Sequence, residues 1–150
     1  LNRRGLQQAL DALQVQGIPF AILALDIDRF KSINDAHGHD VGDAAIVHIA
    51  DQMRRYSRDS DILCRAGGEE FLLLLPGINA EPARQAGERL RQHIADHPFE
   101  PVGTITVSLG VAHFPSFHVD AEQALRLADK ALYMAKEQGR NRVVVYPYAD

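Results

Sequence analysis

The sequence of 150 residues has no tryptophan, two methionines and a single cysteine. One cysteine cannot form a disulfide within the chain, so the fold has to be stabilised by a packed core. Cys64 stands inside an apolar stretch, and we expect a small buried side chain, as is typical of proteins in the reducing cytoplasm. The chain also lacks a run of about 18 apolar residues, which a membrane-spanning helix would need. These absences exclude a disulfide-stabilised fold and predict no membrane contact by this domain itself.

An excess of basic charge is missing as well. The chain carries 16 lysines and arginines against 20 acidic residues, which gives a net charge of −4. A protein that binds nucleic acid usually has a basic patch, so we predict no nucleic-acid partner. Seven histidines are present, but their spacing does not give the converging ligands of a zinc site. The length predicts one domain, 1–150, which is large enough to bury a core.

Hydrophobic periodicity predicts an alternation of helices and strands. Helices are expected over 6–16, from 41, from 79 and from 120, and strands over 20–25, 62–66, 71–75, 104–114 and 142–146. We expect a short helix or turn over 29–35 and a loop over 37–40. The two middle strands form a hairpin, so the sheet cannot be purely parallel. The prediction is an α+β fold: a central, mostly antiparallel five-stranded sheet flanked by helices, close to the ferredoxin-like split βαβ type.

The hairpin contains an acidic turn. Gly67 and Gly68 stand between the two strands, and glycine permits the positive φ angles that two-residue hairpin turns favour. Glu69 and Glu70 follow directly. The pattern alone fits either a solvated acidic turn or a rigid hairpin that presents two carboxylates.

A second acidic pair ends the first strand. Asp26 and Asp28 point to one side of that strand, because side chains alternate along it. If this strand lies beside the hairpin, Asp26 and Glu69 meet at one edge of the sheet. Neighbouring carboxylates repel each other unless a proton or a cation is present, and oxygen ligands suit Mg²⁺. The two acidic pairs therefore predict a magnesium site for chemistry at phosphorus. The alternative is a pair of solvated strand ends.

Five segments of the chain resemble the conserved blocks of one family, the GGDEF domains. They are 67–71 (GGEEF, a variant of the signature), 26–35 (DIDRFKSIND), 38–43 (GHDVGD), 106–112 (TVSLGVA) and 131–141 (ALYMAKEQGRN). These segments occur in the family's order and span nearly the whole chain. The resemblance implies a fold related to polymerase palms and class III nucleotide cyclases.

The resemblance also implies a reaction. GGDEF domains are diguanylate cyclases, which condense two GTP molecules into cyclic di-GMP and release two pyrophosphates. Each domain presents one GTP, so a homodimer is required. The first residues, Leu1-Asn2-Arg3, resemble the end of a longer family motif. We therefore expect a domain excised from a longer bacterial protein with an N-terminal sensory or receiver domain. We expect a cytoplasmic location, including the cytosolic part of a membrane-anchored protein.

The resemblance assigns roles residue by residue. The catalytic residues are Asp26, Glu69 and Glu70, and the metal ligands are Asp26, Glu69 and the carbonyl of Ile27, for two Mg²⁺ or Mn²⁺ ions. The GTP-binding residues are Asn34 and Asp43 for guanine, Lys31, Lys136 and Arg140 for phosphates, and Phe30, His39, Gly67 and Gly68. Without the resemblance, Lys136 and Arg140 would be interpreted as charges that complement a helix C-terminus. The role of Glu70 stays open.

An RxxD motif precedes the hairpin. Arg58 and Asp61 match the family's inhibitory site for cyclic di-GMP, and Arg89 resembles the arginine that completes it. A plain surface ion pair is the alternative for Arg58 and Asp61. Two other functions also remain open: a GTP-sensing module without turnover, and a cyclase for another purine nucleotide.

Overall fold

A continuous apolar segment forms the centre of the fold. All eight residues of strand β1 (Phe20–Ile27) are buried, which requires cover on both faces of the sheet. The computed structural model describes residues 2–115 and 119–146, so Leu1 lies outside the described residues. The other elements, in chain order, are α1 (Arg3–Val15), α2 (Phe30–His37), α3 (His39–Arg55), β2 (Ile62–Gly67), β3 (Glu70–Pro76), α4 (Ala80–Asp96), β4 (Val107–Phe114), α5 (Ala121–Glu137) and β5 (Val143–Val145).

The five strands form one sheet in the order β2-β3-β1-β4-β5. Every pairing is antiparallel except the one between β4 and β5, which is parallel. The predicted fold class is therefore confirmed. The register places Asp26 of β1 opposite Glu70 of β3 on one side and Ser108 of β4 on the other. The acidic end of β1, the central strand, thus lies between the ends of β3 and β4.

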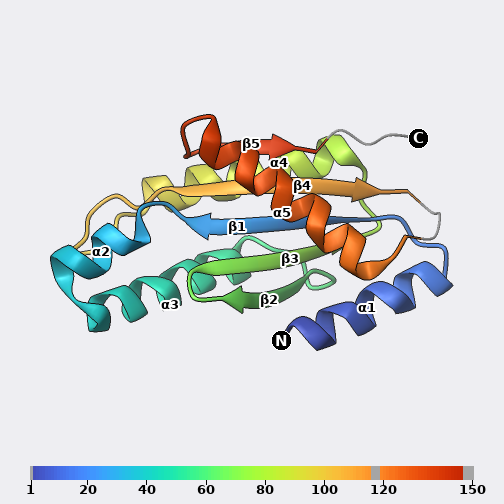
Figure 1. Ribbon diagram of the computed structural model, residues 1–150, viewed down its shortest axis with the longest axis horizontal. Helices are drawn as coiled ribbons and strands as arrows, with labels where there is room; N and C mark the ends of the chain where they lie inside the picture. Colours follow the sequence, from blue (N-terminus) through green and yellow to red (C-terminus); the bar gives the residue numbers. More distant parts are fainter. Residues whose placement is uncertain (1, 116–118, 147–150) are drawn as a thin grey trace.

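Two helical layers cover the sheet (Figure 1). Helices α3 and α4 pack on the face that receives Ala21, Leu23 and Leu25, whereas α1 and α5 pack on the opposite face. Because β1 alternates, Asp26 belongs to the α5 face and Ile27 to the α3 and α4 face. Helix α2 follows the end of β1.

The contact between α5 and β4 is close because Gly110 has no side chain. A Cβ at Gly110 would lie 2.1 Å from the backbone nitrogen of Leu132 and 2.6 Å from the carbonyl oxygen of Ala128. The backbones of strand and helix therefore touch directly. This approach fixes α5 over the sheet and brings its last turn, with Lys136, to the acidic end of β1.

The hairpin differs from its prediction in two ways. Its turn is formed by Gly68 and Glu69, while Gly67 and Glu70 pair across the strands. A register shift between Arg65 and Gly67 adds one residue to β2 and moves the turn along the chain. Neither glycine has a positive φ angle. The guanidinium of Arg65 supports the turn from outside, donating to the carbonyl oxygen of Gly68 at 2.7 and 3.2 Å.

Two other boundaries differ from expectation. The loop predicted over 37–40 is reduced to Gly38, whose φ of 89° ends α2 so that α3 begins at His39. Strand β4 begins at Val107 and not at 104. Helices α4 and α5 begin where expected, with Asn79 and Asp120 as N-caps, but only the Asp120 side chain accepts a cap hydrogen bond. Cys64 is a free, buried cysteine, as predicted.

Candidate active site

The end of β1, the start of α2, the hairpin turn and the end of α5 surround a cavity of about 200 Å³. It is lined by Asp26, Ile27, Asp28, Arg29, Phe30, Lys31, Glu69, Lys136 and Arg140. All but Asp28 and Arg29 are among the predicted site residues. Segments more than 100 residues apart in the sequence thus contribute to one small polar space.

Asp26, like Asp28, is a buried charged group of this cavity. Only 8% of its surface is exposed, and its carboxylate accepts a hydrogen bond from the ammonium group of Lys136. Burial raises the pKa of Asp26, the contact with Lys136 opposes that rise, and the charges of Glu69 and Asp28 add to it. Asp26 therefore lies where negative charge is costly and only partly balanced.

The two glutamates of the hairpin face different surroundings. Glu69 stands in the turn and lines the cavity, and its carbonyl oxygen accepts a hydrogen bond from the backbone of Ile27 at 3.3 Å. Glu70 begins β3 opposite Asp26. Burial, followed by contact with Asp129 of α5, raises the pKa of Glu70 to about 7. Glu69 therefore faces the cavity, whereas Glu70 lies close to other carboxylates.

The donor set fits a divalent cation. Asp26 and Glu69 are hard oxygen donors on one cavity. Burial, and after it the charges of Glu69 and Asp28, raises the pKa of Asp26, and a bound cation would relieve this cost. Two carboxylates and one main-chain carbonyl leave coordination positions for water and phosphate oxygens, as Mg²⁺ prefers. Within residues 2–115 and 119–146, no three acidic, histidine or cysteine side chains converge as a metal site by themselves.

Three predicted phosphate ligands surround the same cavity. Lys136 contacts Asp26, and Arg140 follows α5 with a left-handed backbone at φ 65°. Lys31 is strongly exposed and pairs with Asp35 one helical turn later at 3.0 Å. Their ammonium and guanidinium groups are suited to charge-assisted hydrogen bonds with phosphate oxygens.

The predicted guanine ligands lie on α2 and α3, which pack against each other. The side-chain oxygen of Asn34 is buried without a hydrogen-bond partner. It lies against Gly42, where a Cβ would be only 1.8 Å away. Asp43 follows Gly42, and both Asp43 and His39 are exposed on the first turns of α3. A buried side-chain oxygen without a partner is unusual, and a bound donor group would satisfy it.

The hairpin glycines present bare backbone. Gly67 and Gly68 are exposed, and a Cβ at either position would meet no atom within 4 Å. Neither the turn conformation nor internal packing therefore requires glycine there. The cavity lining includes the predicted metal ligands and, of the predicted GTP-binding residues, Phe30 and the three cations. The GTP-binding residues outside the lining are Asn34, His39, Asp43, Gly67 and Gly68.

The RxxD residues pair with each other. Asp61, with only 4% of its side chain exposed, accepts hydrogen bonds from the backbone and the guanidinium of Arg58 at 2.8 and 2.9 Å. Arg58 also donates to the carbonyl oxygen of Pro76 at 2.9 Å. Arg89 lines a separate shallow hollow on α4. The structure thus joins two of the three predicted inhibitory residues directly and leaves Arg89 apart from them.

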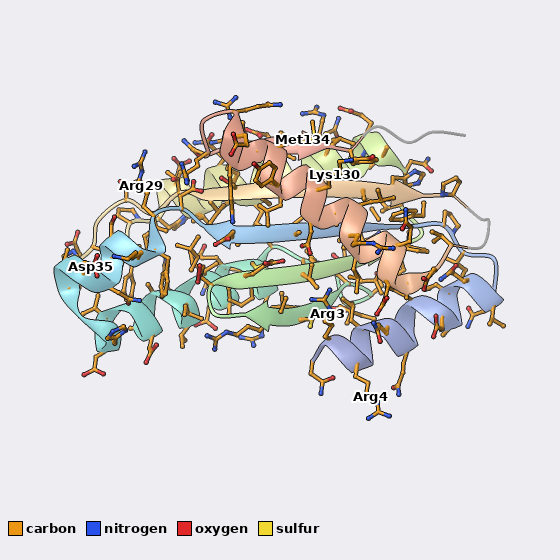
Figure 2. All side chains as sticks on the ribbon, in the orientation of Figure 1. Arg3, Arg4, Arg29, Asp35, Lys130 and Met134 are labelled. Carbon is orange, nitrogen blue, oxygen red and sulfur yellow. The ribbon has the colours of Figure 1, made fainter. Side chains whose placement is uncertain are left out.

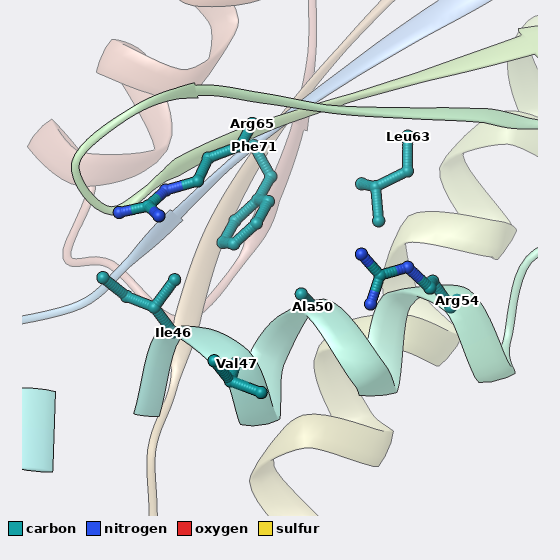
Figure 3. A pocket seen from close by; sticks show the side chains of 7 residues that line it. All are labelled: Ile46, Val47, Ala50, Arg54, Leu63, Arg65 and Phe71. Carbon is teal, nitrogen blue, oxygen red and sulfur yellow. The ribbon is translucent and has the colours of Figure 1, made fainter. Parts of the chain in front are cut away.

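A further hollow of about 320 Å³ lies between α3 and the hairpin (Figure 3). Its lining is mostly apolar, with Arg65 toward the hairpin and Arg54 near Leu63. The sequence-based site included none of these residues. Each of them also fits an ordinary packing or surface role, so no pattern in the sequence marked the hollow.

Sequence reasoning missed three residues near the cavity. Asp28 was noted only as part of the acidic pair, although it lies within the lining. Arg29 begins α2 with a left-handed φ of 56°, and Figure 2 shows its side chain at the α2 end of the molecule. Asp129 approaches Glu70 from α5. A signal for Asp129 was present, because it stands seven residues before Lys136 and so shares a helix face with it.

Comparisons with known proteins agree on one family. Residues 1–142 match the family model described as "Diguanylate cyclase, GGDEF domain". The active GGEEF domain of a diguanylate cyclase from Vibrio cholerae has 35% sequence identity and a TM-score of 0.89, with 99% of this chain and 98% of that one covered. The GGDEF domain of DgcB from Caulobacter crescentus, in complex with c-di-GMP, has 31% identity and a TM-score of 0.89, with 95% and 86% covered.

Curated relatives are longer than this chain. Diguanylate cyclase DgcP of Pseudomonas aeruginosa is 42% identical over 144 residues, which is 93% of this chain and 21% of the relative. The probable diguanylate cyclase DgcT of Escherichia coli is 38% identical over 141 residues, or 91% of this chain and 31% of the relative. The chain therefore spans about a fifth to a third of these two proteins.

Proposed function

Because the chain belongs to the GGDEF family of diguanylate cyclase domains, we propose that it condenses two GTP molecules into cyclic di-GMP. One observation carries the proposal. A single cavity gathers two carboxylates suited to a divalent cation, Asp26 and Glu69, and two cations suited to phosphates, Lys136 and Arg140. This is the set of charges that a nucleoside triphosphate with its metal requires.

The metal would be held by Asp26, Glu69 and the main-chain carbonyl of Ile27, with Mg²⁺ or Mn²⁺ as the candidates and two ions per site. When bound, it supplies charge neutralisation at the reacting phosphate. Lys31, Lys136 and Arg140 bind the β- and γ-phosphates. Lys136 already bridges from α5 to Asp26, so it is held where a phosphate would share its charge.

Guanine recognition is assigned to Asn34 of α2 and Asp43 of α3. The unpaired oxygen of Asn34 accepts from guanine, and Asp43 accepts from the ring N–H and amino group. Phe30 and His39 border the nucleotide. Gly67 and Gly68 allow close approach of the ligand to the hairpin backbone, since neither position needs glycine for any internal reason.

The reaction requires two copies of the domain. The 3′-oxygen of each GTP attacks the α-phosphorus of the other, its proton leaves to solvent or a nearby base, and the bond to pyrophosphate breaks. Two such steps close the ring and release two pyrophosphates. Each cavity binds one triphosphate, so a homodimer presents the two nucleotides to each other, and positioning supplies much of the rate. Asp26 and Glu69 act through the bound cation. Glu70 completes the catalytic group as the neighbour of Asp26 across the strands.

Feedback by the product is assigned to Arg58, Asp61 and Arg89. The DgcB domain of Caulobacter crescentus has been solved with c-di-GMP, which supports product binding within the family. In this chain the Arg58–Asp61 ion pair has to open for both groups to bind a nucleotide. Binding of product therefore exchanges one set of hydrogen bonds for another.

The domain works as part of a longer protein, with an N-terminal sensory or receiver domain that controls dimer formation in the bacterial cytoplasm. The partial coverage of the curated relatives supports this arrangement. Among the helices of the described residues, none combines the length and apolarity needed to cross a membrane.

Product analysis tests the proposal. The domain is incubated with Mg²⁺ and either GTP or ATP at high protein concentration, free and as an enforced dimer, and the nucleotides are separated by chromatography. We expect cyclic di-GMP from GTP and no cyclic dinucleotide from ATP. Nucleotide binding without product would indicate a GTP-sensing module, and turnover of ATP would indicate a different purine nucleotide cyclase.

A further inference from the structure

Asp28 is buried beside the cavity and makes an unusually complete set of hydrogen bonds. One carboxylate oxygen accepts from the hydroxyl of Ser108 at 2.6 Å. The other accepts from the hydroxyl of Thr106 at 2.7 Å and from the backbone N–H of Asn141 at 3.0 Å. The donors are Ser108 of β4, Thr106 just before β4, and Asn141 in the turn after α5, so one carboxylate joins three segments that are distant in the sequence.

The turn after α5 has a rare backbone conformation. Gly139, Arg140 and Asn141 have φ angles of 123°, 65° and 47°. Left-handed backbone is unfavourable for residues with a Cβ and persists only where surrounding contacts enforce it. In the described chain, the only other non-glycine residue with a positive φ is Arg29. Both Arg29 and Arg140 line the cavity, so the strained backbone is concentrated at the candidate site.

Several contacts hold this turn in place. The N–H of Arg140 bonds to the carbonyl of Ala135 at 3.0 Å, which closes the end of α5. The side-chain oxygen of Asn141 accepts from Arg91 of α4 at 2.9 Å. The bond from Asn141 to Asp28 is the one that ties the turn to β1, the strand that carries Asp26. The position of Arg140 relative to Asp26 therefore depends on Asp28.

We propose that Asp28 is a positioning residue for phosphate binding: its carboxylate holds the left-handed turn at 139–141 and thereby directs Arg140 to the triphosphate. The inference rests on the proposed function, because it takes Arg140 as a phosphate ligand. It assigns the two aspartates of the Asp-Ile-Asp segment to different tasks. Asp26 meets the ligand's cation, whereas both carboxylate oxygens of Asp28 accept hydrogen bonds from protein donors.

The test compares nucleotides that differ in their phosphates. Binding of 3′-deoxy-GTP, which lacks the attacking hydroxyl and cannot react, is measured by calorimetry with Mg²⁺, alongside GMP. In Asp28→Asn the amide replaces one accepting oxygen with a donor, so we expect about a tenfold loss of affinity for 3′-deoxy-GTP, the size of one charge-assisted hydrogen bond. Affinity for GMP stays within about twofold. Asp51→Asn, which removes an exposed carboxylate on α3, changes neither affinity.

A double-mutant cycle separates positioning from general damage. Arg140→Ala alone should weaken 3′-deoxy-GTP binding, and Asp28→Asn should add little further loss in that background. If Asp28→Asn does not fold, Thr106→Val takes its place in the cycle, with a smaller loss in the same direction. The inference would be overturned if Asp28→Asn weakened binding of 3′-deoxy-GTP and GMP equally. It would also be overturned if Asp28→Asn caused the same tenfold loss of 3′-deoxy-GTP affinity in the Arg140→Ala background as in the unmodified domain.

The same data distinguish failure of the inference from failure of the proposed function. If 3′-deoxy-GTP does not bind the unmodified domain, or if Arg140→Ala binds it unchanged, the proposed GTP site is wrong. If Arg140→Ala weakens binding while Asp28→Asn does not, the GTP site stands and only the positioning role is lost.

Discussion

Two polar clusters in this domain differ in how their charges are balanced. At the end of β1, Asp26 and Glu70 have raised pKa values because they are buried among other carboxylates and share few cations. At the turn before β2, Asp61 is more completely buried in its side chain, yet Arg58 satisfies it through two hydrogen bonds and an ion pair. Burial alone therefore does not distinguish the two clusters.

The difference indicates what each cluster needs. Crowded carboxylates gain from a bound cation, so ligand binding at the end of β1 relieves an existing cost. A satisfied ion pair has to be broken before its groups can bind anything else. We therefore expect the first cluster to control turnover and the second to control a weaker, regulatory interaction.

The largest effect is expected at Glu69. Glu69→Gln keeps the size and the turn but removes one anionic metal ligand, so cyclic di-GMP formation should fall by at least about a thousandfold. Initial rates measured with GTP and Mg²⁺ check this, and Mg²⁺ affinity should fall in parallel. Thermal unfolding without metal should change little, because the Glu69 carboxylate makes no hydrogen bond or ion pair within residues 2–115 and 119–146. Retained activity would contradict the metal assignment.

The next largest effect is expected at Gly42, which packs against the buried, unpaired side-chain oxygen of Asn34. Gly42→Ala would place a Cβ 1.8 Å from the Asn34 oxygen and displace that side chain. We expect KM for GTP to rise about tenfold, the value of one or two hydrogen bonds, with a smaller change in kcat. Gly87→Ala is the matched control in a helix, because its Cβ would meet only side chains at 3.3 Å or more. Equal kinetic effects from both substitutions would show that Asn34 does not bind guanine.

A third prediction tests the balanced cluster. Arg58→Ala removes the partner of Asp61, so the concentration of cyclic di-GMP needed for half inhibition should rise about tenfold, while the uninhibited initial rate changes little. Stability should fall by about 1–2 kcal/mol, since the buried Asp61 carboxylate loses its guanidinium donor and keeps only the backbone N–H of residue 58. Arg58→Lys keeps the charge but not the planar fork and should give an intermediate result. Unchanged inhibition in both variants would leave Arg58 and Asp61 as a structural ion pair.

The smallest effect is the pH dependence of stability in the metal-free domain. The pKa of Glu70 is about 7 in the fold against an ordinary 4.5, so the folded state holds this proton more tightly than the unfolded chain. Its contribution is complete below pH 4.5 and is lost as the pH rises through 7. With a chelator present, Glu70→Gln should flatten the fall in unfolding free energy over this range by on the order of 1–2 kcal/mol. Parallel curves for the two proteins would contradict the crowded environment of Glu70.

Most of the fold could be predicted from the sequence because local signals and the sheet pattern agreed. The apolar run of β1 and the hairpin together required a mixed sheet, and the helices carried clear buried faces. The hairpin turn was misplaced because glycine pairs predict a turn but not its register. The extra residue between Arg65 and Gly67 depends on pairing with β3, which no local pattern encodes. The prediction of a loop over 37–40 was also wrong, since a single residue with positive φ, Gly38, connects the two helices.

The candidate site was predicted in its composition but not in its organisation. Asp26, Glu69, Lys136 and Arg140 converge on one cavity, as the resemblance implied. The division of labour between Asp26 and Asp28 could not be predicted, because it depends on donors from Thr106, Ser108 and Asn141. Those partners are about 80 to 113 residues distant in the chain. The position of Arg89 apart from Arg58 also needed the three-dimensional structure.

In the proposed mechanism each domain carries half of a catalytic site. Cyclic di-GMP formation from GTP and Mg²⁺, measured over a wide range of domain concentrations, tests this. The rate per domain should rise with concentration until the dimer is saturated, and an enforced dimer should show the saturated rate at every dilution. A rate per domain that is independent of concentration, or no cyclic di-GMP from the enforced dimer, would show that the half-site mechanism is wrong.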